Sequence, residues 1–209
     1  MQPAARSLPG LVRLAILLAP LCFAPGVAAQ AATQWEAGAG AGLAMFSRIA
    51  RRQDAAGDAS LVPYRATVIG VSLSWHHRGW EVSSGLETLD AVLAVQDAQV
   101  AVLAREASLS RLRWLLLAGG RVARMGNASV RASAGPALDV WSPAGAASRT
   151  RVAAVARLGF RLDAGSVTLE HAVAVSVSRS PLGAAELPDG YRGSALRMVE
   201  VGLGLRLRL

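Results

Sequence analysis

Residues 199–209 alternate apolar and polar positions without a break. The apolar series is Val199, Val201, Leu203, Leu205, Leu207 and Leu209, and between these stand Glu200, Gly202, Gly204, Arg206 and Arg208. Successive side chains of a β-strand point to opposite faces. A period of two therefore predicts a strand with one apolar face and one charged or vacant face.

The same period recurs along most of the chain and predicts an all-β protein. The predicted strands cover residues 34–46, 67–76, 80–87, 109–124, 130–141, 151–162, 167–178 and 199–209. Asp163 and Gly165, between two of these segments, are residue types that favour a tight hairpin turn. The pattern therefore predicts eight antiparallel strands in chain order.

The connections between these strands fall into two length classes that alternate. Longer loops cover residues 47–63, 90–108, 142–149 and 179–194, and short turns cover residues 76–79, 125–127 and 163–165. This sorting is typical of an up-and-down transmembrane barrel of the bacterial outer membrane, which keeps its short turns and both termini on the periplasmic side. A sandwich with Greek-key crossings has no reason to sort its loops in this way.

Aromatic residues give an independent indication of the same architecture. Trp35, Trp75 and Trp80 all fall at the side of the short turns, and all three share the parity of the apolar face. Indole rings prefer the boundary between lipid and water. Trp141 and Tyr64 lie near the opposite rim, although Trp141 has the parity of the inner face.

The opposite face of the predicted strands carries charges of both signs. The acids are Glu36, Glu81, Glu87, Asp139, Glu170 and Glu200, and the bases include Arg113, Arg121, Arg131, Arg157, Arg161 and Arg206. Eight strands enclose an interior that side chains can just fill. Because an unpaired buried ion is costly, we expect these charges to pair as a plug, with inward glycines making room for the arginines.

The N-terminal segment has the composition of a secretory signal peptide. Residues 1–13 carry Arg6 and Arg13 without an acid, residues 14–24 are apolar, and small residues follow. We expect residues 1–31 to be removed, with cleavage after Ala29 or Ala31, and residues 32–209 to form the barrel. The alternative, a retained membrane anchor, needs a run of ~20 apolar residues, and this run is shorter. The chain's single cysteine, Cys22, lies within this segment.

Charge gives little indication of an acidic partner. The formal net charge is +8, yet all 22 basic residues are arginine and they are scattered among apolar neighbours. This composition indicates a coding bias more than a basic patch, so we expect no binding of nucleic acid.

Several short segments resemble a known family. They are residues 111–117 (Arg-Leu-Arg-Trp-Leu-Leu-Leu), residues 134–138 (Ala-Gly-Pro-Ala-Leu), Leu169-Glu170 and residues 202–204 (Gly-Leu-Gly). Together they resemble the small outer-membrane β-barrel proteins related to OmpX and OmpA, over essentially all of residues 33–209. The resemblance implies an eight-stranded barrel inserted by the barrel-assembly machinery. Family members usually end in Phe, whereas Leu209 ends this sequence, and the fourth strand lacks a proline often seen there.

Candidate chemistry is sparse. The histidines are His76, His77 and His171, and their spacing provides no set of metal ligands. His171 has outward parity with Glu170 beside it, which keeps open a lipid-acting hydrolase, although Glu170 faces the other way. Gly38, Gly40 and Gly42 are followed by no helix and form no phosphate loop. We therefore expect no catalytic, cofactor or metal site.

The leading hypothesis is a non-enzymatic, monomeric outer-membrane protein with a filled lumen, in contact with outer-membrane lipid and acting structurally or through its extracellular loops. Two alternatives stay open: an outer-membrane lipid hydrolase, and a secreted lipocalin-like barrel with its charged face outside. The ligand of the long loops does not follow from their mixed charge.

Overall fold

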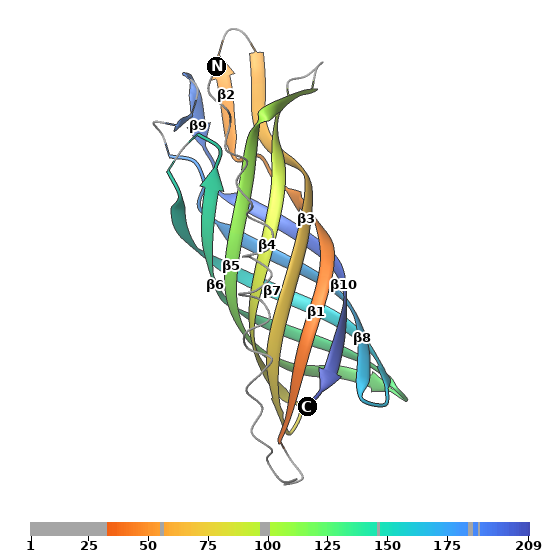
Figure 1. The fold of residues 1–209 in the computed structure, drawn as a ribbon. Helices are drawn as coiled ribbons and strands as arrows, with labels where there is room; N and C mark the ends of the chain where they lie inside the picture. Colours follow the sequence, from red (N-terminus) through yellow and green to blue (C-terminus); the bar gives the residue numbers. More distant parts are fainter. Residues whose placement is uncertain (1–32, 55–56, 97–100, 146, 184–185, 188) are drawn as a thin grey trace, which may run out of the picture.

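The computed structural model describes residues 33–54, 57–96, 101–145, 147–183, 186–187 and 189–209, almost entirely as antiparallel strands (Figure 1). The predicted signal peptide, residues 1–31, lies outside the described residues. The strands are β1 (Thr33–Phe46), β2 (Ala50–Asp54), β3 (Gly57–His77), β4 (Trp80–Gln96), β5 (Ala101–Met125), β6 (Ala128–Pro143), β7 (Arg149–Ala164), β8 (Val167–Ser178), β9 (Tyr191–Gly193) and β10 (Leu196–Arg208).

Eight of these strands close into a ring, which confirms the predicted barrel. The order around the ring is β1-β10-β8-β7-β6-β5-β4-β3, and β1 closes it by pairing with both β10 and β3. Each strand thus pairs with its neighbours along the chain, apart from the closing pair. Closure leaves no open sheet edge in the ring, as a structure that spans lipid requires.

The two ends of the barrel differ. At one end, the turn end, the chain passes directly from His77 to Trp80, from Met125 to Ala128 and from Ala164 to Val167. At the other, the loop end, β2 pairs with β3 and β9 beyond the ring, and these strands project upward in Figure 1. Arg52 lies over the ring of Tyr191, 5.7 Å from its centroid, and links β2 to β9.

Two predicted loops are wrong in extent. Residues 47–63 hold β2 and the start of β3, and residues 90–108 hold the end of β4 and the start of β5. Both hairpins continue past the ring because their backbones stay paired, with Leu61 opposite Ala50 and Gln96 opposite Ala101. The pairing register of the second hairpin shifts between Val92 and Ala94, which marks a bulge or irregularity where the hairpin leaves the ring.

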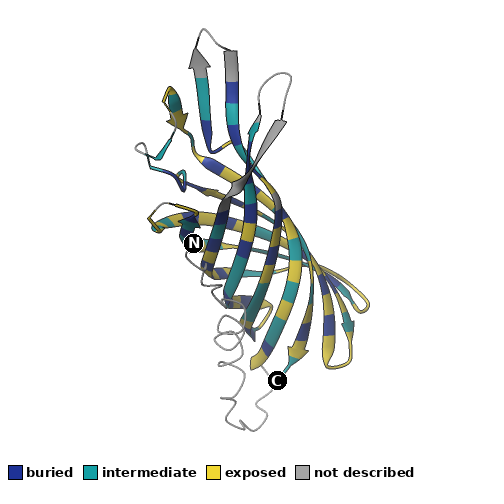
Figure 2. Ribbon diagram, turned by 45° about the horizontal axis from the view of Figure 1, so that its top comes forward, coloured by how far each residue is buried: buried dark blue, intermediate teal, exposed yellow. Residues whose placement is uncertain are grey.

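The alternation predicted from the sequence matches the two faces of the wall. Along β8 the burial alternates residue by residue, and Figure 2 shows the same banding on the other strands. Exposed apolar side chains cover the outer face and the buried charged side chains lie in the lumen, whereas the lipocalin-like alternative needs its charged face outside. In the described residues no helix is long and apolar enough to cross a membrane.

An apolar core fills the lumen at the loop end. Its buried members come from most of the ring strands and from the segments that cross the mouth: Ala44, Ile49, Ala50, Leu61, Ala66, Val68, Leu89, Ala91, Leu93, Leu109, Trp141, Leu182, Leu196 and Met198. Trp141 is fully buried here. Its inward parity, rather than its position near the rim, determines where its indole side chain packs.

Candidate functional site

The lumen toward the turn end holds a buried ionic network centred on Glu170 of β8. One oxygen, Oε1, lies 3.0 Å from Nη2 of Arg157, and the other, Oε2, accepts hydrogen bonds from Nε of Arg161 (2.8 Å) and Nε of Arg206. Arg206 also donates to Ser74 Oγ at 2.7 Å. Three strands, β7, β8 and β10, are thereby tied together through one carboxylate.

Glu81 of β4 extends this network across the lumen. It accepts a hydrogen bond from Arg161 at 2.8 Å and one from Arg131 at 3.0 Å. Arg131 Nη1 also lies 3.2 Å from Nδ1 of His76, and His76 Nε2 lies 2.9 Å from Glu36 Oε2. Because a guanidinium only donates, Nδ1 of His76 is the acceptor in its contact with Arg131.

A second ionic cluster lies nearer the apolar core. Arg113 of β5 makes two hydrogen bonds to Asp139 of β6, at 2.6 and 2.9 Å, and a third to Glu200 at 3.3 Å. Arg111 donates to Glu200 at 2.9 Å, and its guanidinium lies 5.6 Å from the ring centroid of Trp141. This cluster joins the charged lumen to the apolar core above it.

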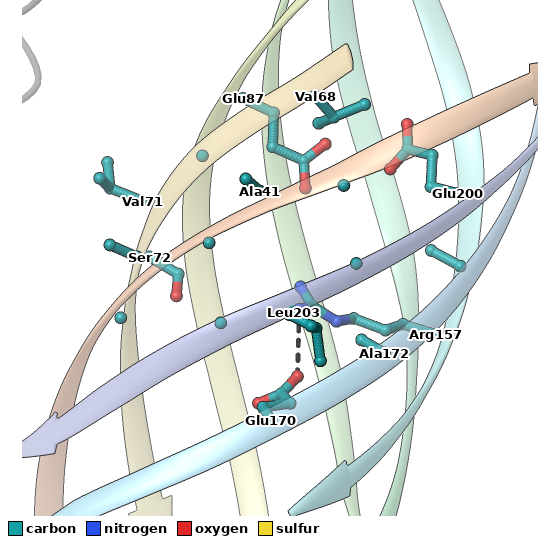
Figure 3. Close-up of a pocket in the computed structure, with 18 of the residues that line it drawn as sticks. Ala41, Val68, Val71, Ser72, Glu87, Arg157, Glu170, Ala172, Glu200 and Leu203 are labelled. Atoms are coloured by element: carbon teal, nitrogen blue, oxygen red, sulfur yellow. Dashed lines mark ion pairs between the residues drawn. The ribbon is translucent and has the colours of Figure 1, made fainter. Parts of the chain in front are cut away.

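A cavity of about 100 Å³ separates the two ionic clusters (Figure 3). Glu87, Glu200, Arg157 and Glu170 border it, as do the glycines of β1 and β10. Glu87 Oε2 is buried without a hydrogen-bond partner among the described residues, and Arg111 Nη2 lies 3.6 Å from it.

The glycines of β1 and β10 let these strands approach closely. Gly40 pairs with Gly204 and Gly42 with Gly202, and a side-chain carbon on Gly42 would lie 2.5 Å from the backbone oxygen of Val201. Glycine is required here by backbone contact, in addition to the predicted role of making room for arginine side chains.

The predicted salt-bridged plug is confirmed with one correction. Every acid assigned to the inner face makes an ion pair with an arginine, and the arginines of the inner face do the same except Arg121, which is exposed at the turn end. The register of β5 shifts between Arg121 and Ala123. The backbone N–H of Arg121 donates to the backbone oxygen of Gly79, in the turn between β3 and β4. Arg111, a further member, follows from the same parity.

Residues that follow β8 pack at the loop end, where Leu182 belongs to the apolar core. Pro181 and Leu182 are buried, and Arg151 Nε donates to the backbone oxygen of Ser180 at 3.0 Å. Glu186 accepts hydrogen bonds from Arg149 Nη2 (2.8 Å) and from the backbone N–H of Gly183 (2.7 Å). The Arg149 hydrogen bond, followed by that of Gly183, lowers the pKa of the Glu186 carboxyl.

The histidines do not assemble into a site. His171 is exposed on the outer face of β8, opposite Phe160 and Leu203, whereas Glu170 faces the lumen. The nearby Thr168 donates its hydroxyl to Asp163 at 2.7 Å. His77 stacks on Trp75 with ring centroids 5.6 Å apart. Within the described part of the chain no group of His, Cys, Asp and Glu could hold a metal ion.

No family model matches the sequence, and no curated protein matches it either. The structure is similar to solved outer-membrane proteins. OprG from Pseudomonas aeruginosa superimposes with a TM-score of 0.56 at 12% identity, covering 85% of this chain and 97% of OprG. The fold is that of a small outer-membrane β-barrel. AlkL in lipid bilayers matches with a TM-score of 0.56 at 13% identity, over 90% of this chain and 95% of AlkL. Neisserial surface protein A matches with a TM-score of 0.54 at 12% identity, over 84% of this chain and 97% of its own.

Proposed function

We propose that this chain is a non-enzymatic protein of the bacterial outer membrane with a structural or surface-interaction role. The observation that carries the proposal is the outer face of the closed ring. Arg121 and Arg124 mark the turn end of this face, and Asp90 and Arg197 mark its loop end. Between these two ends, the described strands carry no Asp, Glu or Arg on the outer face. Large apolar side chains are exposed there on every ring strand. A belt of this size calls for lipid as its solvent.

The proposed orientation places the loop end outside the cell and the turn end, with Thr33 and Arg208, in the periplasm. The short turns and the projecting hairpins support this assignment, because outer-membrane barrels keep short turns on the periplasmic side. Trp35 and Trp80 are exposed near the turn end, at the depth where indole rings gather.

The filled lumen supports a role other than a pore. Ionic clusters cross the barrel at two levels, and Leu182 and Leu187 pack in the apolar core above them. Interaction at the cell surface then belongs to β2, β9 and the tips of β3, β4 and β5. The proposed partners are outer-membrane lipid and, during insertion, the barrel-assembly machinery, and the protein acts as a monomer.

The deciding experiment is to fold residues 32–209, without the predicted signal peptide, into detergent micelles. A membrane barrel migrates faster on an electrophoresis gel when unheated than when boiled, and it stays in the detergent phase on partitioning. Recovery of a folded, water-soluble monomer without detergent would overturn the proposal.

The enzymatic alternative, a lipid hydrolase, can be tested at His171, which is exposed on the outer face. A His171→Ala variant, expressed beside the parent protein, should leave the lipid A of the host membrane unchanged by mass spectrometry. Loss of a lipid A modification that only the parent produces would replace the present proposal with that of a lipid hydrolase.

A further inference from the structure

The outer faces of β8 and β10 both end in arginine at the loop end. In β10, Arg197 is exposed between the buried residues Leu196 and Met198. Arg179, directly after β8, is exposed beyond the buried Ser178. Val177 is the register partner of Arg197, so Arg179 stands one outward position farther along the neighbouring strand. Side chains at such diagonal positions are within reach of one another when they are long.

Neither arginine has an ion pair within the part of the chain that the structure describes. Two other arginines at this end do have partners: Arg149 is bound to Glu186, and Arg151 donates to the Ser180 carbonyl. Among the described side chains of the strands, the acid on the outer face is Asp90 of β4, and β1 and β3 separate β4 from β10. Two neighbouring positive charges therefore lie together at this rim without a counter-charge among the described side chains.

The surface directly below the pair is apolar. Val175 and Val177 on β8 are 48% and 50% exposed, Val199 on β10 is 36% exposed, and Met45, the partner of Val199 on β1, is 60% exposed. A ligand that fits both parts has acyl chains on one side and a strong anion on the other.

Arg48 adds a third exposed guanidinium to this rim. It follows Ser47, whose Oγ accepts the backbone N–H of Arg197 at 2.9 Å. Its own carbonyl accepts a hydrogen bond from Ser194 Oγ at 2.8 Å, which fixes the backbone there. The rim of β1, β10 and β8 thus combines a positioned backbone with cations that have no ion pair among the described side chains.

We propose that Arg179 and Arg197 bind a phosphate group of the phosphorylated glycolipid that forms the outer leaflet, with its acyl chains on Val175, Val177 and Val199. Guanidinium groups recognise phosphate through paired, charge-assisted hydrogen bonds that an ammonium group cannot reproduce. This inference rests on the proposed function, which places the loop end at the outer leaflet.

The test uses the full barrel folded in detergent micelles, with bisphosphorylated lipid A as the probe. The Arg179→Gln/Arg197→Gln variant should bind it on the order of tenfold more weakly than the parent protein, because two charge-assisted contacts are lost. Arg179→Lys/Arg197→Lys keeps the charge and should recover only part of the affinity. The matched control, Arg78→Gln/Arg124→Gln, removes two exposed arginines at the turn end and should bind like the parent protein.

Two further arms identify the source of the phosphate. Lipid A without phosphates should bind the parent protein as weakly as it binds the double Gln variant, and inorganic phosphate should not compete. Equal binding by parent and variant, or full competition by inorganic phosphate, would overturn the inference. Each measurement is made on protein that shows heat-modifiable migration, so a failure to fold counts against the proposed function and not against the lipid site.

Discussion

Arg113 and Asp139 face each other on adjacent strands, and neither side chain reaches solvent. The bidentate hydrogen bonds between them offset the cost of removing both charges from water, but the pair as a whole adds little net stability compared with apolar residues of the same volume. Removing one partner is different, because the remaining ion stays buried and unpaired.

The Arg113→Leu substitution should therefore lower the free energy of unfolding by about 3–5 kcal/mol. The double variant Arg113→Leu/Asp139→Leu should recover most of that loss. Urea unfolding of the barrel refolded in lipid vesicles measures both values. Additive losses in the double variant would contradict this coupling. They would mean that Glu200 and Ser176, each at 3.3 Å, are the dominant partners of Arg113.

Gly42 is required by backbone contact rather than by conformation. A methyl group there would meet the carbonyl of Val201 at 2.5 Å. The neighbouring Ala41 is exposed on the outer face, on the same strand and opposite Leu203. Substitutions at these two positions therefore compare the inner and the outer face of the same strand.

Gly42→Ala should destabilise the barrel by about 1–3 kcal/mol, as overpacking does, whereas Ala41→Val should change stability by less than about 0.5 kcal/mol. Folding yield in vesicles and urea midpoints measure the difference. Equal stability of the two variants would show that β1 and β10 can separate at this point without cost.

Period two alone places residues such as Arg111, Arg113 and Glu170 in the lumen, and the structure agrees. It does not identify their partners, because Arg111 and Glu200 are 89 residues apart and meet across the ring. Such pairs depend on the register around the closed barrel, which has no local signal in the sequence. Trp114 is similar: its indole N–H donates to Ser84 at 3.0 Å on the outer face, a bond that only the β4–β5 register creates.

At the scale of elements, an ion pair between Glu186 and Arg149 holds the segment after β8 against the start of β7. Glu186 stays ionised to a lower pH than a free glutamate because Arg149 and the Gly183 N–H stabilise the carboxylate. A depressed folded-state pKa contributes stability above the ordinary glutamate value of 4.5, and that contribution is lost as the pH falls through the folded value.

Acidification below pH 4.5 should therefore progressively loosen the contact of residues 180–183 and 186–187 with β7 while the ring stays folded. Limited proteolysis with an acid-active protease, compared between pH 3 and pH 5, measures the change. Glu186→Gln should be cleaved quickly at both pH values, and Arg149→Gln should behave alike. A pH-independent cleavage pattern in the parent protein would show that Pro181 and Leu182 hold the segment by packing alone.

The ring strands could be predicted because each one carries the period of two over most of its length. The short strands β2 and β9 could not, because Ala-Arg-Arg-Gln-Asp and Tyr-Arg-Gly carry no such alternation. They form because β3 extends past the ring and offers an edge on which β2 pairs, and β2 in turn pairs with β9. Their existence depends on the neighbouring strand rather than on their own side chains.

At the scale of the whole molecule, the tryptophans report on depth. Trp35 and Trp80 are exposed near the turn end, Trp114 is exposed within the wall between Leu86 and Leu138, and Trp141 is fully buried in the apolar core. Trp75 lies beside His77 at the turn end. If the outer belt is immersed in lipid, these environments correspond to interface, hydrocarbon and protein interior.

Single-tryptophan variants, with the other four positions changed to Phe, should separate these environments in vesicles of brominated lipid. Trp114 should be quenched most by bromines deep in the acyl chains, because its N–H is satisfied by Ser84 and needs no water. Trp35 and Trp80 should be quenched most by bromines near the headgroup. Trp141 should be quenched by neither lipid, because the barrel wall and the apolar core enclose it. Strong quenching of Trp141, or none at Trp114, would mean that the ring does not face lipid with the surface assigned to it.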